Sequence, residues 1–113
     1  MIDAADRIDP NVGFQYVRAV ATVAENTSVN NAIEVAKVAK KLTGRALVNT
    51  LDVIDHIAEY HNHSGDELLK EVMNFALSYE GDQSTLAIKM GYISAMAYTT
   101  HSFSYREIGR AHV

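Results

Sequence analysis

The segment Leu86–Tyr98 constrains the fold most, because as a helix it would carry apolar side chains around nearly its whole circumference. One side would carry Leu86, Met90, Ile93 and Ala97, and much of the other Ile88, Gly91, Ala95 and Tyr98. A helix that is apolar on nearly all sides must be covered on nearly all sides. We therefore expect a helix over about residues 84–100 that lies either at the centre of a helical bundle or at a subunit interface.

Length and composition limit the class of protein. The 113 residues fit one domain, and an apolar content of 48% is enough for a core. The lack of cysteine excludes a disulfide scaffold and thiolate metal sites. A net charge of −4 disfavours a general nucleic-acid coat protein. No apolar run approaches the roughly 20 residues of a membrane span, and the acidic N-terminus does not resemble a signal peptide. We expect a cytoplasmic protein with no membrane contact.

Start and stop signals, together with the spacing of apolar residues, divide the chain into five helices. Asp9 before Pro10 is a helix start, and Ser64 with Glu67 forms a capping box. A second helix starts at Ser28 or Asn31. The predicted helices cover about residues 10–25, 28–42, 45–61, 65–80 and 84–100, and we expect Asp82 or Ser84 to cap the last one. Short connections predict an all-α, five-helix antiparallel bundle.

In the helix of residues 10–25, we expect an apolar stripe to face the core. It consists of Val17, Val20, Ala21 and Ala24, with Phe14 at its edge.

The final six residues, 108–113, read Ile-Gly-Arg-Ala-His-Val. They resemble one reading frame of a widely used short-read sequencing adapter. We therefore expect a single helical domain in residues 1–107 that is cut short, followed by a non-native tail in residues 108–113. The nucleotide sequence of these codons tests this expectation.

A row of polar residues suggests a metal site on the third helix. Asp52, His56, Glu59 and His63 are spaced four, three and four residues apart, which places them on one helix face. His56, Glu59 and His63 offer ligands that suit a divalent metal ion. This face lies opposite the apolar stripe of the same helix, whereas metal sites in helical bundles are built inward. A solvated polar face is therefore the favoured interpretation, and a metal-binding protein or metal-dependent enzyme is an alternative. No other cofactor is expected.

The helices of about residues 31–43 and 45–61 loosely resemble a helix-turn-helix, with the turn at Thr43 and Gly44. The candidate DNA-contacting residues are Lys37, Lys40, Lys41, Arg45 and Asn49, with Thr50 beside them. The spacing from Ala39 to Gly44 is five residues rather than the usual four. The carboxylates Asp52, Asp55 and Glu59, further along the helix of residues 45–61, would also repel phosphate. A helical hairpin with lysines at a helix C-terminus is therefore favoured, and a DNA-binding regulator is an alternative.

The last helix supplies the candidate interaction surface, which comprises Ile88, Gly91, Tyr92, Ala95 and Tyr98. Gly91 and Ala95 form a pair of small residues four apart, which permits close helix approach. No nucleotide-binding glycine loop or nucleophile elbow is present in the sequence. The sequence therefore predicts a non-catalytic helical interaction protein that forms a homo-oligomer or docks a protein partner. For the small-residue pair taken alone, simple core packing is the favoured interpretation, and it requires the other four helices to cover the last helix completely.

Overall fold

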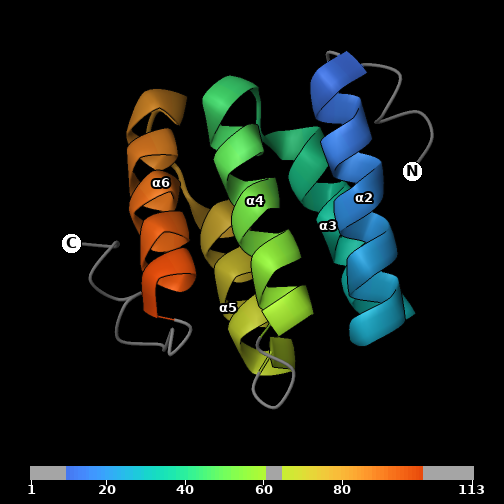
Figure 1. The fold of residues 1–113 in the computed structure, drawn as a ribbon. Coiled ribbons are helices and arrows are strands. Elements are labelled where there is room, and N and C mark those ends of the chain that lie inside the picture. Colours follow the sequence, from blue (N-terminus) through green and yellow to red (C-terminus); the bar gives the residue numbers. More distant parts are fainter. Residues whose placement is uncertain (1–9, 61–64, 101–113) are drawn as a thin grey trace.

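The computed structural model describes residues 10–60 and 65–100, which form five α-helices and no strand. The helices are α2 (Pro10–Asn26), α3 (Val29–Lys41), α4 (Gly44–Tyr60), α5 (Gly65–Ser78) and α6 (Gln83–Thr100) (Figure 1). This confirms the all-α, five-helix prediction. The predicted helix starts at Asp9 and Ser64 rest on residues that lie outside the described ones.

Local capping groups fix several helix boundaries. Ser28 begins α3, where its Oγ accepts a hydrogen bond from the backbone N–H of Asn31 at 3.1 Å. The Asp82 carboxylate likewise accepts a 2.7 Å hydrogen bond from the backbone N–H of Thr85 in the first turn of α6. Gly44 has a φ of +53°, in the left-handed region that favours glycine, and this allows the abrupt turn from α3 into α4.

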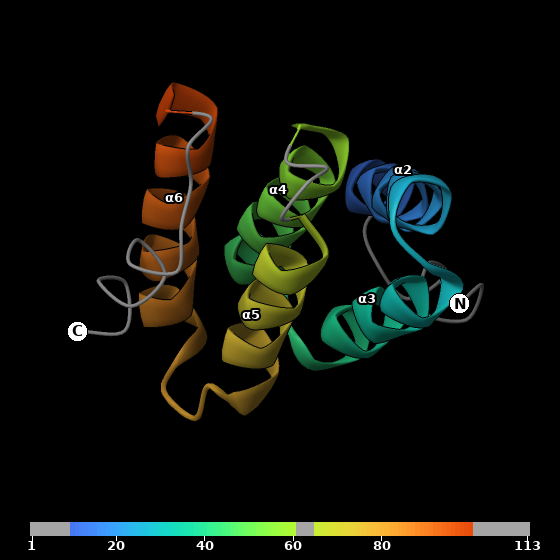
Figure 2. The same cartoon turned by 90° about the horizontal axis from the view of Figure 1, so that it is seen from below.

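The helices form two layers. α2, α4 and α6 lie side by side and run in the same general direction, whereas α3 and α5 run the opposite way behind them (Figure 1). Seen from below, α6 is inclined to α2, and α5 and α3 form the second layer (Figure 2). Consecutive helices are therefore antiparallel, as the short connections predict.

α4 is the central helix. It packs against α2, α5 and α6 and also touches α3. Its side chains Leu51, Ile54 and Ile57 are fully buried. In the described residues, α6 packs on α4 and has at most slight contact with any other helix. The sequence predicts that α6 lies either at the centre of the bundle or at a subunit interface. The first of these two positions is wrong, because α4 occupies the centre.

Only one side of α6 is covered. Leu86, Met90 and Ile93 are fully buried, whereas Ile88 on the other side is 74% exposed. The expectation that nearly all sides of α6 are covered is therefore wrong within the monomer. Of the two apolar sides, the one with Leu86, Met90 and Ile93 faces the core. In residues 10–60 and 65–100, neither α6 nor any other helix is long and apolar enough to cross a membrane.

The orientation predicted for α2 is only partly right, because, of the predicted stripe, only Val20 and Ala24 pack against the core, and both are half-buried. Tyr16, Ala19 and Val23 are buried, whereas Phe14 is 75% exposed and Val17 is also exposed. Residues 16, 19 and 23 form a stripe that is rotated from the predicted one by about one residue, or roughly 100°. Apolar residues occur on both stripes, so periodicity alone does not determine which one faces the core.

Candidate functional site

The polar face of α4 is enclosed. His56 is 2% exposed, Asp52 and Asp55 are half-buried, and Glu59 is exposed. The expectation that this face is solvated is therefore wrong for His56, which is enclosed, and holds for Glu59. The physical reason is that α2 and α6 flank α4 and supply polar partners to its side chains.

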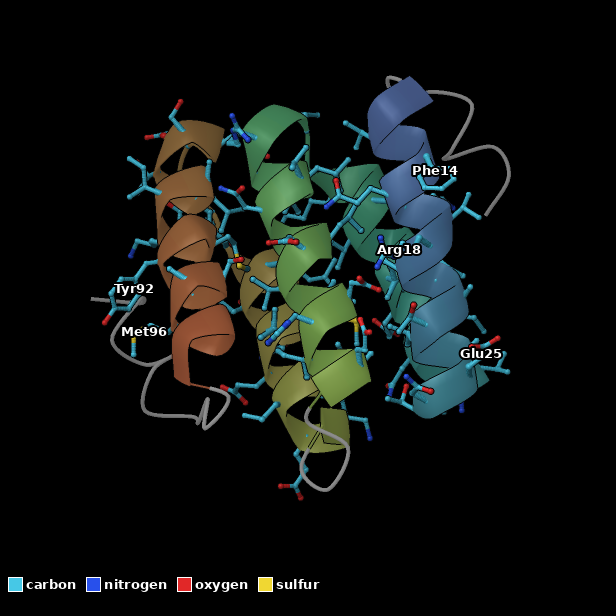
Figure 3. All side chains as sticks on the ribbon, viewed as in Figure 1. Phe14, Arg18, Glu25, Tyr92 and Met96 are labelled. Atoms are coloured by element: carbon cyan, nitrogen blue, oxygen red, sulfur yellow. The ribbon has the colours of Figure 1, made fainter. Side chains whose placement is uncertain are left out.

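Two side-chain contacts show how these carboxylates are accommodated. Asp52 Oδ2 accepts a 2.7 Å hydrogen bond from Ser94 Oγ of α6. Asp55 Oδ2 lies 3.7 Å from Arg18 Nε of α2, and Arg18 points toward α4 (Figure 3). Because partly buried polar groups need partners, these contacts allow α4 to be covered despite its polar residues.

Side-chain amides connect neighbouring helices of the front layer. Each donates to a backbone carbonyl of the next helix: Gln15 Nε2 to Val48 at 3.3 Å, Asn26 Nδ2 to Ala58 at 3.0 Å and Asn49 Nδ2 to Ala87 at 2.8 Å. The first two bonds join α2 to α4, and the third joins α4 to α6. They fix the relative heights of the three helices along the layer.

The predicted metal ligands are not seen together. His56 is buried, Glu59 is exposed, and His63 lies outside the described residues. Within residues 10–60 and 65–100, no group of three or more His, Cys, Asp or Glu side chains is placed to hold a metal ion. The described part of the chain thus supplies two of the three predicted ligands, in different environments.

Two of the candidate DNA-binding lysines are engaged within the protein. Lys37 forms a 2.9 Å ion pair with Glu34. Lys41 Nζ donates to the backbone carbonyls of Leu77 and Tyr79 at the end of α5, the latter at 3.0 Å. The bonds of Lys41 place its ammonium group where it satisfies carbonyls that the end of α5 leaves without partners.

Two of the proposed base-reading residues, Asn49 and Thr50, are engaged within the protein. Asn49 is bonded to α6, and Thr50 is fully buried with its Oγ1 donating to the Ala46 carbonyl at 2.7 Å. Lys40 and Arg45 are exposed. A recognition helix must present a free side to a major groove about 12 Å wide. α4 has helices packed against it from three directions, so the candidate residues do not gather on a free helix face.

The outer side of α6, which we define as Ile88, Tyr92 and Ala95, faces solvent. Ile88 is 74% and Tyr92 43% exposed, and Ala95 is exposed too. Figure 3 shows Tyr92 on the side of α6 that points away from α4. Gly91 lies where this side borders α4, because a Cβ there would lie 3.3 Å from Asn49 Nδ2. The side chain of Tyr98 is not among those that the structure describes.

A second group of exposed apolar side chains lies at the far end of the molecule and was not predicted from the sequence. On α2 the group consists of Phe14 and Val17, and on α3, which packs against α2, of Val29 and Ile33; we call it the α2/α3 edge. Figure 3 shows Phe14 pointing away from the protein on the side opposite to Tyr92. The signal in the sequence was the presence of apolar residues on more than one side of residues 10–26.

An open groove of about 330 Å³ lies between α3 and α5. Its lining residues are Asn30, Asn31, Glu34, Lys70, Met73, Asn74 and Leu77. Glu34 is paired with Lys37, and Asn31 Nδ2 donates to Thr27 Oγ1 at 3.3 Å. These polar groups therefore already have partners within α3 and its N-terminal turn.

Displaced pKa values do not mark a catalytic centre in the described part of the chain. Burial raises the pKa of the Tyr16 hydroxyl in α2. Hydrogen bonds from Thr85 lower the pKa of Asp82 at the start of α6. The two groups lie on helices at opposite ends of the front layer, so they do not form an acid–base pair. Comparisons with models of known protein families, with curated proteins and with solved structures found no match to the chain.

Proposed function

We propose that the protein is a non-catalytic helical interaction module that docks a protein chain, its own copies included, through the outer side of α6. The observation that carries this proposal is the exposure of Ile88 in the middle of a well-packed helix. Ile88, Tyr92 and Ala95 are four and three residues apart, so they form one continuous stripe.

The free energy of covering this stripe is appreciable. Full burial of an isoleucine side chain is worth about 1.5–3 kcal/mol. With 74% of Ile88 exposed, most of that free energy is available to a partner. Tyrosine is enriched among residues that dominate binding energy, because it buries a large rigid ring and keeps a polar tip. Lys89 is the one charged residue in the sequence of α6, so little desolvation of charge opposes docking.

The stripe is also held rigidly. Leu86, Met90 and Ile93 anchor the inner side of α6 in the core, and Asp82 caps its first turn. The bonds from Asn49 and Ser94 fix the helix to α4. A surface that is ordered before binding loses little conformational entropy on association, which favours its use for docking.

Site-specific photocrosslinking tests the proposal. A photoreactive residue at position 92 should give a covalent adduct in cells that encode the protein, whereas one at exposed Asn74 on α5 should not. Ile88→Asp should abolish the adduct at position 92, and circular dichroism should show that the variant remains folded. Equal labelling from positions 92 and 74 would refute docking through α6.

A further inference from the structure

We infer that the occupant of the outer side of α6 is the α2/α3 edge of a second copy of this chain, bound head to tail. The α2 of the second copy would then extend the layer formed by α2, α4 and α6. This inference rests on the proposed function and names its partner.

The distribution of exposed apolar residues supports this choice. In the described residues, every exposed large hydrophobic side chain belongs to α2, α3 or α6, and none belongs to α4 or α5. These side chains therefore lie at the two ends of the helix array. A head-to-tail contact covers Phe14 and Val17 together with the outer side of α6 at one interface, whereas a contact between two α6 helices would leave Phe14 and Val17 exposed.

The register of the layer supports it as well. Gln15 is bonded to Val48, and the next residue, Asn49, is bonded to Ala87, so residues near 15, 48 and 87 lie at similar heights. α2, α4 and α6 run in the same direction (Figure 1). Because α6 is inclined to α2 (Figure 2), the added α2 would be tilted to follow α6; at the same height its Phe14 would lie beside Ile88. Its Val17 and Ala21 would lie on either side of Tyr92, since all α-helices rise about 1.5 Å per residue.

Charge does not oppose this arrangement. The single cation of α6 is Lys89. The cation of α2 that lies at a similar height is Arg18, which points toward α4 and pairs with Asp55 rather than facing the edge. Glu25, an anion, points outward from α2 (Figure 3). The two surfaces thus meet without opposing like charges.

The size of the contact sets the expected affinity. α6 has 18 residues, so it offers a strip about 27 Å long and about 10 Å wide. Such a strip falls below the roughly 800 Å² that each partner contributes to a standard interface. We therefore expect a dissociation constant between about 1 μM and 1 mM. Because a head-to-tail contact does not close on itself, the assembly should grow with concentration.

Complementation between two variants of the full 113-residue chain tests the inference. Phe14→Asp disables the α2/α3 edge and Ile88→Asp disables the outer side of α6, and both side chains are about three-quarters exposed. In sedimentation velocity up to about 1 mM, the wild type should form species larger than a dimer. Each variant alone should weaken association at least about tenfold, whereas an equimolar mixture should form a dimer and nothing larger. Asn74→Asp is the matched control and should behave like the wild type.

Three outcomes would overturn the inference. Dimerisation of Phe14→Asp alone would indicate contact between two α6 helices, and would leave docking through α6 intact. A wild-type chain that stays monomeric at about 1 mM would exclude a second copy as the occupant. In that case an adduct from position 92 to a different protein would still support the proposed function, whereas no adduct would remove both. Unchanged growth of the assembly in either variant would show that the named surfaces are not the ones in contact.

Discussion

Replacing isoleucine with alanine at positions 54 and 88 should have very different effects on stability. Ile54 lies on α4 and is fully buried, whereas Ile88 lies on α6 and is 74% exposed. The chemical change is the same at both positions, and both lie within helices. The comparison therefore measures which helix is enclosed.

The magnitudes follow from burial. Ile54→Ala should cost about 2–5 kcal/mol, because it removes buried carbon atoms and leaves a cavity. This is a large part of the roughly 5–15 kcal/mol that stabilises a typical domain. At position 88 only about a quarter of the side chain is covered, so the lost transfer free energy is about 0.4–0.8 kcal/mol. Alanine's higher helix propensity recovers a few tenths of a kcal/mol, so Ile88→Ala should change stability by less than about 0.5 kcal/mol.

Urea denaturation followed by circular dichroism measures both free energies of unfolding. The protein should be kept at about 1 μM, so that association through α6 does not contribute. An Ile88→Ala cost above about 1.5 kcal/mol would mean that the outer side of α6 is covered within the monomer. A cost below about 1 kcal/mol for Ile54→Ala would refute the central position of α4.

Two further predictions concern helix ends. Hydrogen bonds lower the pKa of Asp82 below its usual value of 3.8, so its stabilising effect is complete above that value and is lost as pH falls through the lowered pKa. Asp82→Asn keeps the cap without the charge, so the melting-temperature difference from the wild type should shrink between about pH 5 and pH 2; a constant difference would contradict this. Lys41→Met should lower the free energy of unfolding by about 0.5–1.5 kcal/mol, because it removes bonds to the end of α5, whereas Lys40→Met should leave it unchanged in the same urea assay; equal losses would contradict the role of Lys41.

The helix boundaries were predictable because the signals that set them are local. Ser28 and Asp82 act within three residues of themselves, on backbone groups that any helix start leaves without partners. These interactions depend little on the rest of the fold. The five-helix architecture could therefore be predicted from short stretches of sequence.

The roles of α4 and α6 could not be predicted in this way. Hydrophobic periodicity treats Asn49 and Asp52 as residues that require water. In the fold these side chains bond to the Ala87 carbonyl and to Ser94, both about 40 residues away in sequence. A helix with polar residues can be central when its neighbours supply such partners, and this information is not local. Conversely, an apolar helix such as α6 can lie at an end of a layer and keep one side uncovered.

Because α6 packs almost entirely on α4, it is the helix that can separate through the loss of a single helix–helix interface. Its detachment would expose Leu86, Met90 and Ile93 together with the row of α4 that contains His56, while α2 to α5 kept their mutual contacts. Native-state amide exchange should therefore report α6 as a cooperative unit of its own. A chain bound to its outer side would slow that opening, so docking and local unfolding of this protein are linked through one helix.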